Sequence, residues 1–88
     1  MKPLVKVRLL QIVAENELIT SDALFEIIAQ EYQGERFVTP ENLDEYLRSF
    51  ATRGLLETRQ MNAFTFDGVE QKMCRVTDMG KRSLKALL

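Results

Sequence analysis

The sequence predicts a small α+β domain in which three helices are followed by a β-hairpin and a last helix. Two patterns indicate this fold class. Apolar residues recur at helical spacing as far as Gly54, and the period changes between Leu55 and Thr77 around the turn signal Asp67-Gly68. Hydrophobic residues make up 45% and charged residues 28% of the chain, which is the usual balance of a folded globular protein. With 88 residues the chain has the size of one domain, so residues 1–88 are expected to fold as a single unit.

The first predicted helix, residues 3 to 15, carries two apolar stripes. The stripe expected to face the core consists of Val5, Leu9, Ile12 and Val13. The second stripe consists of Val7, Leu10 and Ala14. A helix with two apolar stripes has two apolar neighbours, so the second stripe should contact the last helix or a partner subunit. We therefore expect a homodimer that uses this second stripe together with the apolar tip of the later hairpin.

A short break separates this helix from the second one. Ile19 is expected to enter the core as an anchor or a short strand. Thr20 or Ser21 is a good N-cap for the next helix, and Asp22 lies in its first turn, where the helix dipole favours an anion. Gly34 is expected to end this helix as a C-cap.

The third helix has the clearest start in the chain, at Thr39-Pro40. Thr39 can cap the helix, and proline suits the first helical position. The buried face is expected to contain Leu43, Leu47 and Phe50. The opposite face contains Glu41, Glu45, Arg48, Ser49 and Thr52. Gly54 is expected to close the helix.

The hairpin that follows is predicted to turn at Asp67-Gly68, because both positions of a type I′ turn need positive φ. This turn pairs Phe66 with Val69, Phe64 with Gln71, Met61 with Cys74, and Arg59 with Val76. Cys74 would then face inward, and Phe64 and Phe66 would lie on the other face near the tip. A bulge in either strand would change this register. Thr77 is expected to cap a short last helix.

Several chemistries are excluded by composition. The chain has no histidine and a single cysteine, Cys74, so imidazole catalysis, an internal disulfide and a zinc site are not expected. Cys74 is interpreted as a buried structural residue. The sequence has no glycine-rich phosphate loop and no nucleophile beside a base, so we expect neither an enzyme nor a cofactor. No apolar run approaches the ~20 residues that span a membrane, and a reducing, cytoplasmic setting is expected.

Charge is distributed unevenly along the chain. The net charge is −1, but residues 15 to 45 contain nine acidic residues and one basic residue, Arg36. From residue 46 onward, basic residues outnumber acidic ones by eight to four. Such a division can orient a molecule on a charged partner, or it can reflect solvated faces that happen to differ.

Two segments resemble a known family. Arg53-Gly54-Leu55-Leu56-Glu57 is similar to the "RGLI/RGLV" end of the third helix in winged-helix domains. The segment from Arg75 to Leu84 resembles their "LTxxG" segment after the wing. Together with the order of elements, these segments resemble winged-helix transcriptional regulators of the multiple-antibiotic-resistance and phenolic-acid-regulator types, over about residues 4 to 88.

The resemblance implies a dimeric regulator that binds double-stranded DNA, with the third helix in the major groove and the hairpin wing on the backbone or minor groove. The residues that it assigns to DNA contact are Asn42, Arg48, Ser49, Thr52, Arg53, Arg59 and Lys72.

The residues also allow a second interpretation, a winged helix that binds protein. Glu41, Asp44 and Glu45 would stand near phosphates at the start of the third helix, and Arg48 could pair with one of them instead of reading DNA. The partner would then dock on this acidic surface and on an aromatic wing tip. That tip comprises Phe64, Phe66 and Val69.

Overall fold

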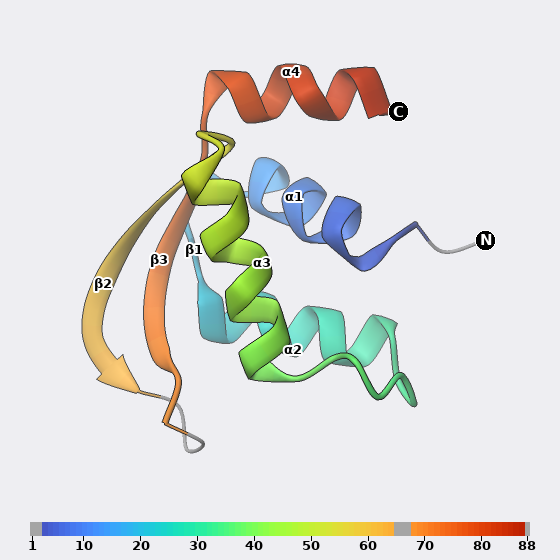
Figure 1. The fold of residues 1–88 in the computed structure, drawn as a ribbon, viewed down its shortest axis with the longest axis vertical. Helices are drawn as coiled ribbons and strands as arrows, with labels where there is room; N and C mark the ends of the chain where they lie inside the picture. The colour runs from blue at the N-terminus through green and yellow to red at the C-terminus, as the bar shows by residue number, and fades with distance from the viewer. Residues whose placement is uncertain (1–2, 65–67, 88) are drawn as a thin grey trace.

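The computed structural model describes residues 3–64 and 68–87, and it shows the predicted α+β order (Figure 1). The elements in chain order are α1 (Val5–Glu15), β1 (Ile19–Thr20), α2 (Ser21–Glu31), α3 (Pro40–Thr52), β2 (Leu56–Phe64), β3 (Glu70–Val76) and α4 (Asp78–Leu87). Within the described ranges, no helix combines the length and the apolar character that a membrane crossing requires.

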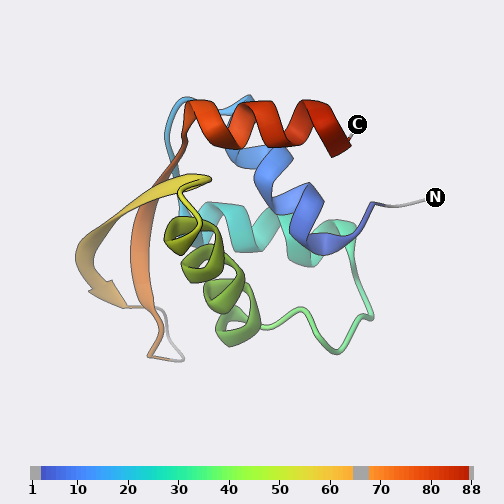
Figure 2. The ribbon, with the colours of Figure 1, turned by 45° about the horizontal axis from the view of Figure 1, so that its top comes forward.

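The three strands form one antiparallel sheet in the order β1-β3-β2. Ile19 of β1 pairs with Cys74 of β3, so the short strand predicted near Ile19 exists and makes β3 the central strand. Figure 2 shows the hairpin of β2 and β3 along one side of the helices, with β2 as the outer strand. One face of β3 therefore meets the helices, while β2 remains largely exposed.

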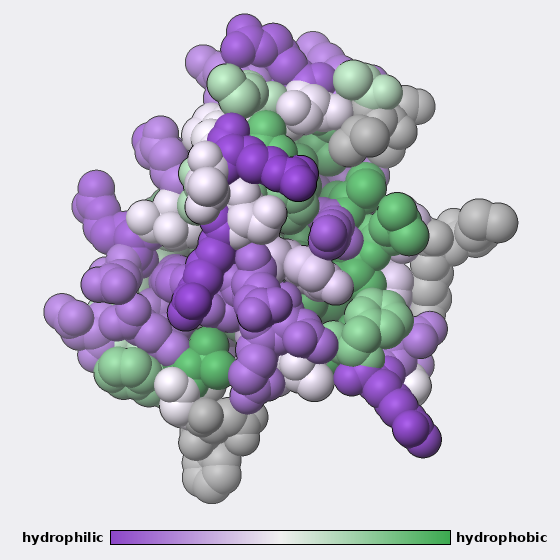
Figure 3. Space-filling model, in the orientation of Figure 1, coloured by the Kyte–Doolittle hydropathy of each residue, from purple (hydrophilic) through white to green (hydrophobic). Residues whose placement is uncertain are grey.

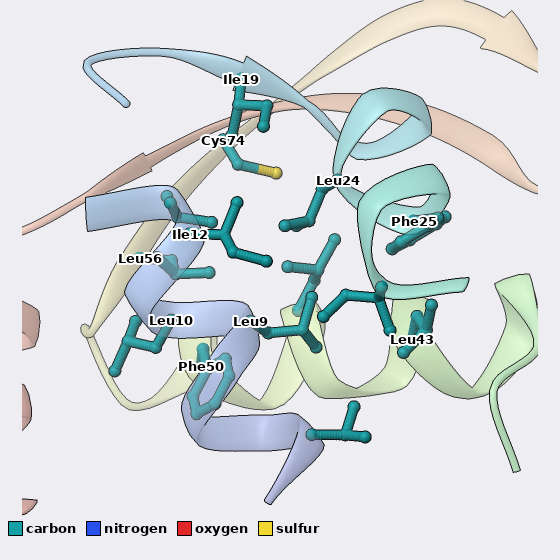
Figure 4. Close-up of a cluster of buried hydrophobic side chains, with 14 of the residues drawn as sticks. Leu9, Leu10, Ile12, Ile19, Leu24, Phe25, Leu43, Phe50, Leu56 and Cys74 are labelled. Atoms are coloured by element: carbon teal, nitrogen blue, oxygen red, sulfur yellow. The ribbon is translucent and has the colours of Figure 1, made fainter. Parts of the chain in front are cut away.

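The hydrophobic core lies between α1, α2, α3 and the inner face of the sheet (Figure 4). Leu43, Leu47 and Phe50 of α3 are buried, as their spacing predicts, and Leu47 has no exposed surface. Cys74 is also fully buried, which confirms its interpretation as a core residue.

The second stripe of α1 is not a free surface. Leu10 is 1% exposed and belongs to the core, while Val7 and Ala14 are partly buried against it. The reason is that α4 lies across α1, as both ribbon views show (Figures 1 and 2). Of the two neighbours expected for this stripe, the last helix is therefore the one present, and Leu10 is not available to a partner subunit.

The N-cap of α2 is one of the two residues predicted, whereas its C-terminal end differs from the prediction. Thr20 is the N-cap, and its Oγ1 accepts a hydrogen bond from the backbone N–H of Ala23 at 3.2 Å. Ser21 is fully buried instead, and its Oγ accepts a hydrogen bond from the backbone N–H of Lys72. The helix ends at Glu31, before Gly34, which adopts a positive φ of 85° in the following turn.

The predicted hairpin register is wrong. Near its base Leu56 pairs with Val76 and Gln60 with Lys72, whereas Phe64 pairs with Glu70 beyond an irregularity at residues 61–63. Asn62, with a positive φ of 56°, lies in this bulge. The extra residues shift the register, so Leu56 rather than Met61 lies on the core side of β2, and Met61 is 38% exposed. The predicted partner of Val69, Phe66, lies outside the described residues.

The two segments that resemble winged-helix proteins contact each other where α3 leads into β2 and β3 leads into α4. Gly54, with φ of 78°, closes α3, and the backbone N–H of Leu55 donates to the carbonyl of Phe50. Thr77 donates its Oγ1 hydrogen to the carbonyl of Gly54 at 2.6 Å and accepts from the N–H of Gly80 at 3.0 Å. Thr77 thus caps α4, as predicted, and ties it to the end of α3.

Candidate nucleic-acid interface

Helix α3 begins at a well-defined position, which fixes the residues that lie on its outer face. Oγ1 of Thr39 accepts a hydrogen bond from the N–H of Asn42 at 3.2 Å, and Pro40 occupies the first helical position. Burial of the apolar side turns the polar side outward. The exposed residues are those predicted, namely Glu41, Glu45, Arg48, Ser49 and Thr52. In Figure 1 this helix lies beside the hairpin, and Figure 3 shows mostly hydrophilic side chains over both.

Asn42 is part of the helix start rather than of this outer face. It is half-buried, and its Nδ2 donates a hydrogen bond to the carbonyl oxygen of Phe37 at 2.8 Å. The side chain therefore secures the loop before α3, and we leave Asn42 out of the candidate interface.

Asp44 is buried and paired, which its place among acidic residues in the sequence does not indicate. Grouped with exposed acids by sequence, it is only 5% exposed in the structure. Its Oδ1 lies 2.8 Å from Nζ of Lys72, and its Oδ2 lies 3.0 Å from Nε of Arg48. The spacing of four residues could reveal the contact with Arg48. The inward position of Lys72 could be inferred from its alternation with Cys74, but its contact with Asp44 depends on how β3 packs beside α3.

Lys72 is not an exposed wing residue, contrary to the prediction. Its side chain is 11% exposed and pairs with Asp44. Because β3 is the central strand and its residues alternate, Lys72 shares the inward face with Cys74 and Val76. Lys72 is therefore unavailable to a phosphate, and it also leaves the candidate interface.

The remaining predicted cations are accessible. Arg53 at the end of α3 and Arg59 on β2 are exposed, and neither forms an ion pair with a described residue. Arg48 is 71% exposed although it pairs with Asp44. Arg75 also lies on the sheet, but it pairs with Glu57 at 2.6 Å. The cations of this surface without an ion pair to a described residue therefore lie at the C-terminal end of α3 and on β2, where Arg59 shares with Glu57 and Arg75 the face of the sheet opposite Lys72.

A shallow groove of about 450 Å³ separates the first half of α3 from the hairpin tip. Phe64, which is 63% exposed, and Val69 lie at its wing side. The charged residues that line the groove are Glu41, Asp44, Glu45, Arg48 and Glu70. This part of the surface is predominantly acidic, unlike the end of α3. Phe66, the third predicted tip residue, lies outside the described residues.

The buried thiol of Cys74 is expected to be unreactive at neutral pH. Burial is the main cause that raises its pKa from 9.0 to about 11, although nearby Lys72 lowers it in part. A thiol with this pKa is almost entirely protonated at neutral pH and is a poor nucleophile. Among the residues that the structure describes, no three Cys, Asp or Glu side chains come together as a metal site would require.

Comparisons with known proteins identify the fold. No family model matches the chain, and no curated protein matches it. A solved PadR-like transcriptional regulator from Bacillus cereus strain ATCC 14579 superposes with a TM-score of 0.69 at 18% identity, covering 93% of this chain and 75% of its own. A transcriptional regulator homologue from Pyrococcus horikoshii OT3 gives the same score, identity and coverage of this chain, with 70% of its own length covered. At this identity the likeness shows the fold, which is a winged helix, as the two sequence segments indicate.

Proposed function

We propose that this protein is a transcriptional regulator that binds double-stranded DNA. The C-terminal half of α3 enters the major groove, and β2 of the wing follows the backbone. The observation that carries the proposal is the exposure of Arg48, Arg53 and Arg59 on α3 and the adjacent wing strand. Arginine both neutralises phosphate and reads guanine in the major groove. Both similar solved structures are described as a transcriptional regulator or its homologue, which supports the same function.

The acidic residues of α3 oppose this function less than their number suggests. Asp44 is buried, and its carboxylate faces two cations. Of the three acids at the start of the helix, only Glu41 and Glu45 are exposed, both in its first half. Contact with DNA is therefore most favourable at the second half, where Ser49 and Thr52 can add hydrogen bonds.

A homodimer is part of the proposal. One copy has few exposed arginines on its proposed DNA-binding surface. A second copy bound to a neighbouring half-site doubles the number of phosphate contacts. The contact between copies must use residues other than the buried Leu10. Met79, which is 49% exposed at the start of α4, is the apolar residue that we assign to this contact. Sedimentation velocity at micromolar concentration should show a dimer, and a monomer would exclude the paired half-site arrangement.

The test of DNA binding is fluorescence anisotropy with a labelled mixed-sequence duplex over a range of salt concentrations. Binding should weaken steeply as salt rises, because each phosphate contact releases counterions. If the protein shows no affinity for duplex DNA at ~50 mM salt, where phosphate contacts are strong, the proposal is wrong.

A protein-binding module is the second candidate, favoured by the exposed Phe64 beside the acidic groove. In that case Phe64→Ala should abolish capture of a basic protein partner from a cell extract, while Arg59→Ala should have little effect. If DNA is the ligand, Arg59→Ala should reduce binding and Phe64→Ala should matter less.

A further inference from the structure

One carboxylate joins the proposed recognition helix to the wing. Asp44 on α3 contacts Lys72 on β3 through Oδ1 and Arg48 on α3 through Oδ2. We propose that Asp44 is a positioning residue, which holds the Arg48 guanidinium in one orientation for base readout. The inference rests on the proposed DNA-binding function and concerns how its recognition surface is ordered.

Arg48 needs such a support because its side chain is 71% exposed. A long exposed side chain samples many rotamers, and ordering it on DNA costs conformational entropy. The contact with Asp44 is made at Nε, 3.0 Å from Oδ2. The terminal nitrogens of the guanidinium therefore remain available for a bidentate contact with guanine.

Asp44 can act as this support because it is itself held. An ordinary surface pair of this spacing would hold Arg48 weakly, since both partners move freely in water. Here the Asp44 side chain is only 7% exposed, and Nζ of Lys72 lies 2.8 Å from it. The Lys72 backbone is fixed in turn, because it pairs within the sheet and its N–H donates to Oγ of Ser21 at 2.9 Å. Arg48 is thus tied through Asp44 and Lys72 to the central strand and to α2.

If Asp44 positions Arg48, its loss should affect base discrimination and general DNA affinity differently. Asp44 carries negative charge, so its neutralisation should not weaken general attraction to phosphate. Base discrimination should fall instead, because Arg48 would lose its fixed orientation. A residue that merely stabilised the fold would lower both kinds of binding together.

The variant that tests this is Asp44→Asn combined with Lys72→Met, which removes the carboxylate charge without leaving a buried unpaired ammonium. Selection from a random duplex pool first supplies a preferred site. We expect the ratio of affinity for that site over mixed-sequence DNA to fall about tenfold, the size of one bidentate base contact. Arg48→Ala should cause the same loss, and adding the Asp44 and Lys72 changes to Arg48→Ala should cause no further loss.

Glu17→Gln is the control, because it removes an exposed acid between α1 and β1, outside the proposed interface. It should leave discrimination unchanged. The proposal is overturned if the Asp44→Asn, Lys72→Met variant discriminates as well as the wild type. It is equally overturned if those changes reduce discrimination further in the Arg48→Ala background.

A measurement without DNA separates this inference from the proposed function. The NMR signal of the Arg48 Nε–H should be shifted and protected from solvent exchange relative to that of Arg53, an exposed arginine at the end of the same helix. The difference should vanish in the Asp44→Asn, Lys72→Met variant. If the wild type binds no duplex, the proposed function fails, while this signal still decides whether Asp44 fixes Arg48. Identical signals for the two arginines in the wild type would contradict the positioning role.

Discussion

Gly80 of α4 lies directly against the backbone carbonyl of Leu55. A Cβ at Gly80 would overlap the Leu55 carbonyl oxygen and would lie 2.7 Å from Cγ2 of Val76. The same carbonyl accepts a hydrogen bond from the N–H of Thr77 at 3.1 Å, so it cannot move away freely. The glycine after Thr77 is therefore required by the close packing of α4 on the turn between α3 and β2.

Gly80→Ala should destabilise the protein, although alanine is normally the better helix former by about 1 kcal/mol. The added methyl group meets backbone rather than a flexible side chain, so we expect a net loss of about 1–3 kcal/mol. Urea unfolding measures the change. Lys81→Ala, an exposed position on the same helix, serves as the control and should change stability by less than about 0.5 kcal/mol. An unfolding midpoint for Gly80→Ala at or above that of the wild type would contradict the packing.

Leu47→Ala should cost about 2–5 kcal/mol of unfolding free energy, because it leaves a cavity where a fully buried side chain stood. Thermal and urea unfolding followed by circular dichroism measure the loss. Ser49→Ala, on the exposed face of the same helix, is the control. A melt of Leu47→Ala that coincides with the wild type would exclude the burial of this face.

Asp44→Ala alone should destabilise the protein by about 3–5 kcal/mol, because it leaves the buried Lys72 ammonium without its partner. Replacing both residues, as in Asp44→Leu with Lys72→Met, should recover most of this loss, since neither charge then remains buried. Comparison of the single and double variants by urea unfolding tests this. A double variant no more stable than Asp44→Ala would show that the pair is not the cause.

Stability should fall as the pH rises from 9 to 11, in part because of Cys74. Its thiol has a pKa of about 11 in the folded protein against 9.0 in the unfolded chain, so only the unfolded chain loses the proton in this range. The stabilisation is complete below pH 9 and is lost as the pH rises through the folded pKa, by up to about 2–3 kcal/mol. Lysines and tyrosines titrate in the same range, so the measurement is a difference between wild type and Cys74→Ala. The variant should show the shallower decline, and equal slopes would exclude a contribution from this thiol.

Arg59→Ala should weaken binding to duplexes of every sequence and reduce the slope of log K against log salt by about one, because Arg59 is assigned to a phosphate. Anisotropy titrations at several salt concentrations give this slope. Arg82→Ala removes an exposed arginine from α4, away from the proposed interface, and should leave the slope nearly unchanged. Equal slopes for Arg59→Ala and the wild type would remove Arg59 from the interface.

The features that depend on local chemistry could be predicted from the sequence. Thr39 and Thr77 cap their helices as expected, because an N-cap hydrogen bond involves only neighbouring residues. The buried face of α3 follows in the same way from residue spacing.

The features that depend on strand pairing could not be predicted. The turn signal alone cannot reveal the bulge at residues 61–63, which changes the register of the whole ribbon. Lys72 lies on the same face of β3 as Cys74, which was expected to face inward, so its inward position follows from strand alternation and not from the bulge. Its contact with Asp44 depends on how β3 packs beside α3. For this reason a basic residue that resembled a phosphate contact proved to be the buried partner of Asp44.

The pairing of Ile19 with Cys74 has a consequence for the order in which the protein folds. These residues are far apart in the sequence, and bringing them together costs more loop-closure entropy than forming a helix or a hairpin. The three helices that precede the hairpin cannot complete their core until β3 arrives, since Cys74 and Val76 supply part of it. During synthesis on the ribosome, the finished surface of α3 therefore forms only after β3 has emerged. A nascent chain that ends before β3 would lack both the wing and the Lys72 side chain that holds Asp44.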